Sequence, residues 1–350
     1  MSIYDQAMAA LSTVIEPELN RDIVSLNMVK DLKIENGVAS FTIVLTTPAC
    51  PLKNVFLERC NAALLPLNGI DEVEIRWDAN VPKGLHGNLS MPIQNIIAVA
   101  SGKGGVGKST VSTNLAVSLA EHGARVGLMD ADILGPNIPT MMGLGFARPR
   151  VADVDGVSKM VPFEAYGLKV MSMGFLADPN TPMIWRGPML HSAIRQFFTD
   201  VIWGDLDYMV VDLPPGTGDA QLSLAQSVPL TGAVIVTQPQ DVAVEDARRA
   251  CVMFDKLNVP LLGVIENMAG EIYGMGGGEK LAQERQLPFI GRIPLQANVR
   301  EGGDNGKPVA VVEPNSPAGE AFRTIAQSLA ARVSVVAMSK ADVIPLNIIG

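Results

Sequence analysis

Cysteine is scarce in this chain, and the features that mark secreted and membrane proteins are missing. Its 350 residues include three cysteines, far apart at Cys50, Cys60 and Cys251. An odd and scattered set argues against a disulfide framework and for a reducing compartment. The first residues show no cationic segment followed by an apolar one, so we expect no signal peptide. No uncharged apolar run approaches the roughly 18 residues of a membrane span, so we expect a cytoplasmic protein with no membrane partner.

Basic charge is also in short supply. The chain has 27 Lys and Arg against 36 Asp and Glu, a net charge of -9, and neither half carries a basic excess. A protein that neutralises a run of phosphates needs such an excess, so nucleic acid is not an expected partner. Hydrophobic residues make up 48% and charged residues 18%, which excludes a disordered chain. The length leaves room for about two domains.

The first 80 residues, 1–80, have the pattern of a small α+β domain. Apolar residues at helical spacing from Tyr4 to Ile15 predict a helix that ends at Pro17. The pair Asn36-Gly37 is typical of a two-residue hairpin turn. The other predicted elements are two strands that flank this turn, a second helix and a third strand, over 29–34, 38–45, 52–65 and 73–77.

Residues 81–92 show no periodicity and are predicted to form a linker. After them the sequence consists of short apolar runs separated by segments with helical periodicity. Strands that are apolar on both faces belong to a parallel sheet covered by helices on each side. We therefore expect a doubly wound, mostly parallel α/β domain over 93–340, followed by a tail at 341–350. Its predicted strands are 96–100, 126–129, 168–173, 208–211, 233–236 and 261–265.

A glycine-rich loop follows the first of these strands. Residues 102–109 match the pattern G-x-x-x-x-G-K-[ST] of a P-loop, whose backbone N–H groups surround phosphates at the start of a helix. We expect Lys108 to reach the β and γ phosphates of ATP and the Ser109 hydroxyl to bind Mg²⁺. The predicted nucleotide contacts are Gly102, Lys103, Gly104, Gly105, Val106, Gly107, Lys108, Ser109 and Thr110.

The glycine-rich loop contains a second lysine, Lys103, and this residue points to a resemblance. The loop resembles the deviant Walker A motif of the class that includes MinD, ParA and the nitrogenase iron protein. This resemblance implies a homodimer that sandwiches its nucleotides, in which Lys103 reaches the phosphates bound by the partner subunit. The alternative is a solvated lysine without such a role.

Three aspartates at the ends of two predicted strands complete the expected site. Asp130 and Asp132 follow the strand 126–129, and Asp212 follows 208–211. The resemblance implies that Asp132 orients the attacking water, supported by Asp130, and that Asp212 holds Mg²⁺ through water, with 213–219 as switch II. A single Asp of this kind would more readily be a helix cap, but three in the expected order favour a site.

Asn267, after the strand 261–265, is the candidate for recognition of the base. In the same class the residue at this position recognises adenine, with backbone help from a segment that we place at 292–294. The alternative is that Asn267 only forms a turn, a common role for this residue type.

Further stretches of the sequence resemble one particular family within this class. Residues 132–139, 213–219, 185–188 and 265–268 together resemble the Mrp/ApbC family of iron-sulfur cluster carrier ATPases over 93–336. The stretch Leu45–Pro51 is similar to a SufT-like iron-sulfur assembly domain. The resemblance implies a slow, Mg²⁺-dependent ATPase that carries iron-sulfur clusters to apoproteins, with assembly factors as further partners.

One departure from this family concerns the ligands of the cluster. Its members usually have a C-x-x-C pair after the Asn-Met segment, and two such pairs bridge one [4Fe-4S] cluster across the homodimer. Here the residues 269–278 contain no cysteine. Cys50 is the candidate contact instead: the matching Cys of the assembly domain is reactive, and Pro51 predicts a helix start that makes Cys50 the N-cap and lowers its pKa. A small buried cap is the alternative, and Cys60 and Cys251 are expected in the core.

A second function from the same class is a MinD/ParA-type switch for spatial organisation or partner regulation. Such a protein needs a basic amphipathic helix at its carboxyl end or a basic face. The predicted helix 319–333 carries only Arg323 and Arg332, so we expect it to pack on the sheet.

Overall fold

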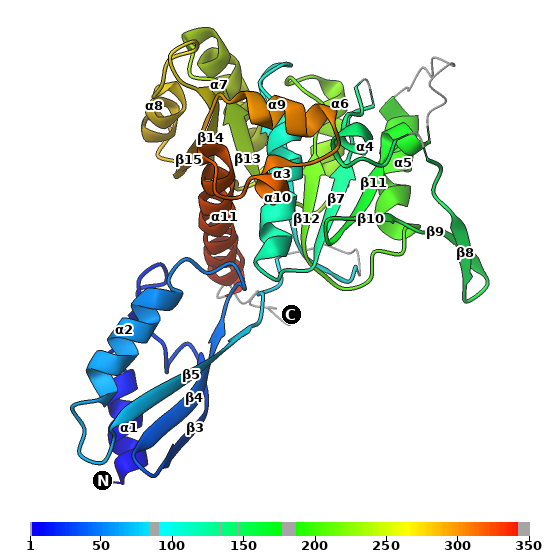
Figure 1. Ribbon diagram of the computed structural model, residues 1–350. Helices are drawn as coiled ribbons and strands as arrows, with labels where there is room; N and C mark the ends of the chain where they lie inside the picture. Colours follow the sequence, from blue (N-terminus) through cyan, green and yellow to red (C-terminus); the bar gives the residue numbers. More distant parts are fainter. Residues whose placement is uncertain (1, 85–90, 134, 146, 177–186, 342–350) are drawn as a thin grey trace, which may run out of the picture.

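The computed structural model describes residues 2–84, 91–133, 135–145, 147–176 and 187–341. Figure 1 shows a smaller unit with the amino terminus at its far end and a larger unit beyond it. Parts of the predicted linker and tail, 85–90 and 342–350, lie outside the described residues, as do Trp185 and Arg186. Among the described residues, no helix has the length and apolar character that crossing a bilayer requires.

The amino-terminal unit, residues 3–79, packs two helices on a three-stranded sheet of order β3-β4-β5. The strands β3 and β4 are antiparallel, whereas β5 is parallel to β4. Asn36 and Gly37 have φ angles of 51° and 83°, so the predicted hairpin turn is confirmed. The elements are α1 (Ile3–Leu11), β1 (Ile15–Glu16), β2 (Arg21–Asp22), β3 (Val29–Glu35), β4 (Val38–Leu45), α2 (Lys53–Leu64) and β5 (Glu72–Ala79).

The prediction that the first helix continues to Pro17 is wrong. The helix α1 ends at Leu11, and Ile15 belongs to the short strand β1. The hydroxyl groups of Ser12 and Thr13 donate hydrogen bonds to the carbonyl oxygens of Ala9 and Ala10, at 2.6 and 2.7 Å. Side chains that bond back to the backbone in this way compete with helix propagation, and the apolar period alone did not reveal them.

The larger unit is built on an eight-stranded sheet of order β10-β11-β7-β12-β6-β13-β14-β15. Among the strands that the structure describes in this sheet, only the edge strand β10 runs antiparallel to its neighbour. Its strands are β6 (Ile93–Ser101), β7 (Val126–Asp130), β10 (Phe163–Ala165), β11 (Leu168–Ser172), β12 (Leu206–Asp212), β13 (Gly232–Thr237), β14 (Leu261–Ala269) and β15 (Phe289–Pro294). The six predicted strands of the doubly wound sheet are confirmed.

Helices cover both faces of this sheet (Figure 1). Met209 and Val211 of β12 pack in one core with α5 and α7, while Tyr208 and Val210 pack in the other with α3 and α11. Every residue of β12 is buried, as expected for a strand inside a doubly wound fold. The helices are α3 (Lys108–Glu121), α4 (Ile138–Met141), α5 (Gly187–Thr199), α6 (Asp219–Ser227), α7 (Asp241–Lys256), α8 (Gly277–Glu284), α9 (Ala297–Asp304), α10 (Val309–Val312) and α11 (Pro317–Ala341), and a 3-10 turn spans Met173–Phe175.

The helix expected over 319–333 is present within the longer α11. Its residues Phe322, Ile325 and Leu329 are fully or almost fully buried, so the helix packs on the sheet as predicted. A hairpin of β8 (Val151–Val154) and β9 (Val157–Met160) was not predicted, because its exposed residues Val151 and Val157 belong to no core pattern.

Candidate functional site: a nucleotide site at the carboxyl ends of the strands

The glycine-rich loop joins β6 to α3, and its backbone lies close to two neighbouring elements. A Cβ atom on Gly102 would lie 2.0 Å from the carbonyl oxygen of Asp246 in α7. Gly107 has a φ of 82°, and a Cβ atom there would lie 2.2 Å from the side-chain nitrogen of Asn267. Both positions therefore require glycine, and the loop ends where α3 begins at Lys108.

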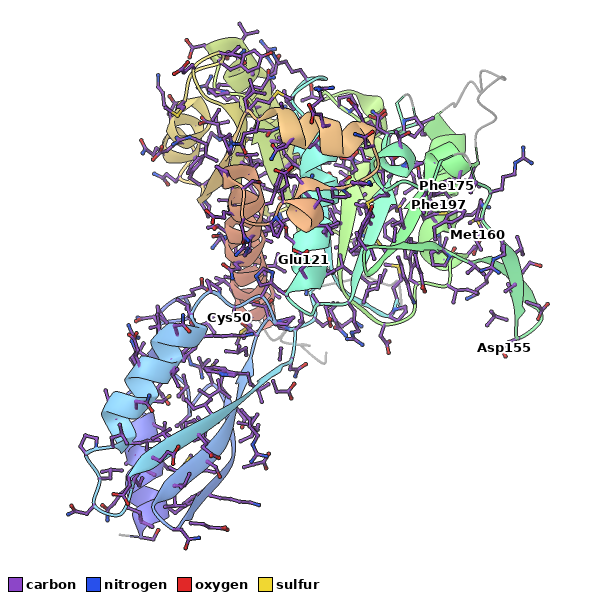
Figure 2. All side chains as sticks on the ribbon, viewed as in Figure 1. Cys50, Glu121, Asp155, Met160, Phe175 and Phe197 are labelled. Atoms are coloured by element: carbon purple, nitrogen blue, oxygen red, sulfur yellow. The ribbon has the colours of Figure 1, made fainter. Side chains whose placement is uncertain are left out.

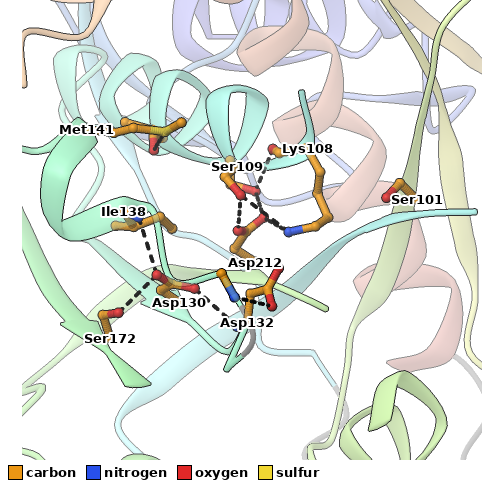
Figure 3. Close-up of polar contacts among 12 residues, drawn as sticks. Ser101, Lys108, Ser109, Asp130, Asp132, Ile138, Met141, Ser172 and Asp212 are labelled. Atoms are coloured by element: carbon orange, nitrogen blue, oxygen red, sulfur yellow. Dashed lines mark hydrogen bonds and ion pairs between the residues drawn. The ribbon is translucent and has the colours of Figure 1, made fainter. Parts of the chain in front are cut away.

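The carboxylate of Asp212 contacts three side chains of α3 through an ion pair and two hydrogen bonds (Figure 3). Lys108 Nζ lies 2.8 Å from Asp212 Oδ1, while Ser109 Oγ donates to Oδ2 and Ser112 Oγ to Oδ1, each at 2.6 Å. Asp212 has no exposed surface, and the Lys108 side chain is 6% exposed. The sequence interpretation missed Ser112, although its place one helical turn after Lys108 puts both on one face of α3.

The chemistry of these side chains shows whether the site could hold Mg²⁺. A hydroxyl oxygen of Ser109 and a carboxylate oxygen of Asp212 lie 2.6 Å apart, at the base of the loop. Oxygen donors of this kind are the ligands that Mg²⁺ takes in P-loop proteins, usually with waters and phosphate oxygens. The residues present fit the ion.

Asp130 is buried beneath the loop that carries Asp132. It accepts hydrogen bonds from the Ser172 hydroxyl at 2.9 Å, from the Asp132 N–H at 3.1 Å and from the Ile138 N–H at 3.3 Å. Burial, and next the negative charge of Asp212, raise the pKa of Asp130 to about 8. Asp130 therefore ties together the end of β7, the end of β11 and the start of α4 (Figure 3).

Two adjoining cavities open on this end of the sheet. The first, of about 390 Å³, is lined by the glycine-rich loop together with Asp132 and Pro215. The second, of about 280 Å³, is lined by Asn267, Pro294 and residues of α9. Both are lined in part by Thr110, Asn137 and Met141, so one elongated molecule can occupy them together.

Lys103 and the two glycines after it form the outer side of the first cavity. Lys103 is half-buried, and Gly104 and Gly105 are exposed. Its backbone carbonyl accepts a hydrogen bond from the Ser101 hydroxyl at 2.9 Å. Within the described part of the chain its ammonium group forms no ion pair.

Asn267 reaches the glycine-rich loop from β14. Its side-chain amide donates to the Val106 carbonyl at 2.8 Å and also faces the second cavity. Of the segment 292–294, Pro294 lines this cavity, whereas Arg292 forms ion pairs with Glu266 and Glu279 outside it. The strand β14 continues to Ala269, so Asn267 lies within it rather than at its end.

The segment that replaces the C-x-x-C pair is closed by its own hydrogen bonds. Gly270 and Gly274 exchange two backbone bonds, at 3.0 and 2.7 Å, and so form a tight hairpin. The N–H groups of Gly276 and Gly278 then donate to the buried carboxylate of Glu266, at 3.0 and 2.7 Å. The N–H groups of Gly270, Gly274, Gly276 and Gly278 thus all have partners within the protein.

Cys50 lies at the junction of the two units, away from the nucleotide site (Figure 2). The prediction that it caps α2 is wrong, because the N-cap is Leu52. The expected fall of its pKa is also wrong: burial raises the pKa of the Cys50 thiol to about 11, and the charges of Glu18 and Glu16 add to this. The alternative of a small buried cap is wrong as well, because Cys50 is not the cap and its side chain is partly exposed.

The other cysteines lie where the sequence predicts. Cys60 packs in the core of the amino-terminal unit and Cys251 in the core between α7 and the sheet, both without exposed surface. Among the described residues, no three His, Cys, Asp or Glu side chains stand together as a metal site.

Each of the two units matches the model of a known protein family. Residues 92–330 match the model of the family described as NUBPL iron-transfer P-loop NTPase, and residues 4–77 match that of an iron-sulfur cluster assembly protein. The iron-sulfur cluster carrier protein of Synechocystis sp. is 49% identical over 97% of this chain and its own full length. That of Deinococcus radiodurans is 48% identical over 96% of this chain and 97% of its own.

Solved structures agree with this assignment. A nucleotide-binding protein from Archaeoglobus fulgidus, in complex with ADP, is 38% identical with a TM-score of 0.53, over 62% of this chain and 88% of its own. The cell division ATPase MinD of Pyrococcus furiosus is 24% identical with a TM-score of 0.54, over 67% of this chain and 97% of its own, and so shares the fold. With a family model that matches more than half of its length, the chain belongs to the iron-transfer P-loop NTPases.

Proposed function

We propose that this protein binds and hydrolyses ATP and carries iron-sulfur clusters to apoproteins. One observation carries the nucleotide part: Lys108, Ser109 and Asp132 line one cavity of about 390 Å³, with Asp212 buried behind them. The carrier part is supported by relatives of nearly the same length that are named iron-sulfur cluster carrier proteins.

In this proposal the two cavities hold the two ends of ATP. The phosphates occupy the first, where glycine N–H groups and the start of α3 favour an anion. The nucleoside occupies the second, where Asn267 and Pro294 lie beside the base. The shared lining by Thr110 and Met141 supports a single ligand across both cavities.

Hydrolysis would depend on positioning and on charge rather than on covalent chemistry. Lys108 leaves its ion pair with Asp212 to bind the terminal phosphates, and Asp132 orients the water that attacks. Ser109 and Asp212 would hold Mg²⁺, which neutralises phosphate charge when it is bound. We expect slow turnover unless a second subunit supplies Lys103 and completes the site.

The cluster is cargo in this proposal, and Cys50 is its contact. The usual C-x-x-C pair is absent, and Cys60 and Cys251 are fully buried. Cys50 is the cysteine with partial exposure, so we propose transient binding through Cys50 with its copy in a second subunit or with an outside thiol. Assembly factors and apoproteins are the proposed partners.

The two sheet units correspond in this proposal to two domains. We place the assembly domain at 1–80, the linker at 81–92, the ATPase domain at 93–340 and a tail at 341–350. The family matches at 4–77 and 92–330 support this division.

Anaerobic reconstitution tests the carrier function. Wild type, Cys50→Ala and, as a matched control, Cys251→Ala are supplied with iron and sulfide, and visible absorption and bound iron are measured. We expect loading of wild type and Cys251→Ala, loss of most loading in Cys50→Ala, and transfer from wild type to an apoprotein. Equal loading of all three rules out Cys50, whereas an unloaded wild type contradicts the carrier function itself.

A further inference from the structure

The three donors to the buried carboxylate of Asp212 differ in what else they contact. Lys108 and Ser109 line the cavity of about 390 Å³, where the proposed function gives each of them a second partner, the phosphates for Lys108 and Mg²⁺ for Ser109. Ser112 is not among the described residues that line this cavity, and it has no exposed surface. Ser112 is therefore the donor that a nucleotide in the cavity does not reach.

The Ser112 hydroxyl has two oxygen atoms within reach but only one proton to donate. Ser112 Oγ lies 2.6 Å from Asp212 Oδ1 and 3.1 Å from the carbonyl oxygen of Lys108, one turn earlier in α3. A hydroxyl that donates to a charged oxygen forms a bond of about 2.5–2.7 Å, which is shorter and stronger than a bond between neutral groups. The distance to Asp212 falls in this range, so the proton of Ser112 goes to the carboxylate.

The two oxygen atoms of Asp212 receive different donors. Among the described residues, Lys108 and Ser112 are the side-chain donors to Oδ1, while Ser109 donates to Oδ2. When Lys108 turns to the phosphates, Ser112 remains as the donor to Oδ1. A buried carboxylate oxygen without any donor is costly, so Asp212 without Ser112 would be free to rotate toward other partners. With Ser112 in place, Oδ2 stays directed at Ser109.

We propose that Ser112 is a positioning residue of the Mg²⁺ site, which holds Oδ1 of Asp212 while a nucleotide is bound and so keeps Oδ2 directed at Ser109 and the ion. The inference rests on the proposed binding of ATP and Mg²⁺. It deepens that function by naming the residue that keeps the metal-binding carboxylate in place after Lys108 has left it. In this role Ser112 touches neither the phosphates nor the ion.

Nucleotide affinity with and without Mg²⁺ tests this role without any measurement of turnover. Isothermal titration calorimetry gives the affinity of wild type, Ser112→Ala and Ser112→Thr for ATPγS, in EDTA and at increasing concentrations of MgCl₂. In EDTA, Ser109 still donates to Asp212, so the affinity of Ser112→Ala should stay within about threefold of wild type. The Mg²⁺ concentration that gives half of the full tightening should rise at least about tenfold in Ser112→Ala, as expected for a lost hydrogen bond to a charged group. Ser112→Thr keeps the hydroxyl and should need the wild-type concentration.

Ser118→Ala is the matched control for the loss of a buried hydroxyl from α3. Ser118 is 1% exposed, and its hydroxyl has no hydrogen-bond partner among the described residues. This variant should keep the affinity of wild type both in EDTA and with Mg²⁺. Electron paramagnetic resonance of Mn²⁺, added with ATPγS to the same proteins, measures the bound metal directly. It should show weaker metal binding in Ser112→Ala and wild-type binding in Ser118→Ala and Ser112→Thr.

Three results would overturn the inference while leaving the proposed function intact. Ser112→Ala could keep the Mg²⁺ dependence of wild type, Ser112→Thr could behave like Ser112→Ala, or the affinity of Ser112→Ala could fall equally with and without Mg²⁺, as a purely structural role predicts. The proposed function fails on wild type instead, and the inference fails with it. Wild type that binds no ATPγS contradicts the nucleotide site, and wild type whose affinity does not respond to Mg²⁺ contradicts the metal site.

Discussion

The carboxylate of Asp212 receives donors from Lys108, Ser109 and Ser112 while none of its surface reaches solvent. Such a charge-assisted arrangement is stable because each donor offsets part of the cost of burying the carboxylate. It also keeps Lys108 extended beside the phosphate cavity before a ligand arrives. The side chain proposed to bind phosphate is thus held by the residue proposed to bind Mg²⁺.

Lys108→Ala is the sharpest single-residue test of the nucleotide site. Because it removes the buried cation of the phosphate cavity, we expect ATP affinity to fall about 10- to 100-fold, the range for a lost hydrogen bond to a charged group. Isothermal titration calorimetry measures this affinity. The matched control is Lys169→Ala, which removes a half-buried lysine bonded to the Trp203 carbonyl and should leave the affinity unchanged. Undiminished binding by Lys108→Ala would contradict the assignment of the loop.

Some residues of the candidate sites could be predicted from the sequence, and the environment of others could not. The spacing of the P-loop gave Lys108 and Ser109, because phosphate binding constrains residues that are neighbours in the chain. The environment of Cys50 could not be predicted in the same way, because its side chain packs against the core of the amino-terminal unit, which brings together residues far apart in the chain. A local helix-start argument therefore predicted a lowered pKa where the assembled protein raises it.

At the scale of elements, α7 supports the glycine-rich loop from outside. The start of the loop lies against the backbone of Asp246 and Ala247, so closely that a Cβ atom on Gly102 has no room. The atoms in contact belong to the backbone of a helix of 16 residues and cannot rotate away. The position of the loop is therefore set by the packing of α7 on the sheet.

Gly102→Ala should separate these two elements. A Cβ atom 2.0 Å from the Asp246 carbonyl oxygen forces the loop or α7 to move, and overpacking of this kind costs about 1–3 kcal/mol. We expect a lower thermal midpoint and weaker ATP binding. Gly104→Ala is the matched control for stability, because its Cβ atom would meet nothing nearer than 4.0 Å. A midpoint equal to that of wild type in Gly102→Ala would show that the loop is not held by α7.

Elements with continuous apolar sequence were predictable, and short exposed ones were not. The central strands are buried on both faces, so their sequence carries the signal by itself. The hairpin of β8 and β9 has its turn at Asp155-Gly156, a pair typical of such turns that the sequence interpretation did not use. The end of α1 depends on Ser12 and Thr13, whose bonds to the backbone leave no trace in apolar spacing.

For the whole molecule, the two units meet at the end of the large sheet opposite the nucleotide site. The nucleotide residues follow the carboxyl ends of β6, β7 and β12, whereas Thr47 contacts Tyr208 near the start of β12. The sequence predicted both units but not how they pack, because apolar periodicity reports on each core separately. The proposed nucleotide residues and the segment of Thr47 therefore lie near opposite ends of β12.

The dimer proposed for this family member makes a prediction that concerns two whole molecules. If Lys103 acts on the partner's phosphates, Lys103→Ala and Lys108→Ala should each hydrolyse ATP slowly when alone. In a mixed dimer, however, the Lys103→Ala subunit keeps its own Lys108 and receives Lys103 from the Lys108→Ala subunit, so one of the two sites is complete. An equal mixture should then recover roughly a quarter of the wild-type rate, since about half of randomly formed dimers are mixed.

The double variant Lys103→Ala/Lys108→Ala is the control for that mixture. Mixed with either single variant it offers no complete site, so phosphate release should stay at the level of the single variants. A lysine that acts within its own subunit gives a different result, because no pairing of the two single variants restores both lysines to one chain. Failure of the equal mixture to recover activity, with both proteins folded and able to associate, would therefore place Lys103 in the site of its own subunit. Lys103, a half-buried residue beside the exposed Gly104 and Gly105, would then serve the cavity of its own subunit alone.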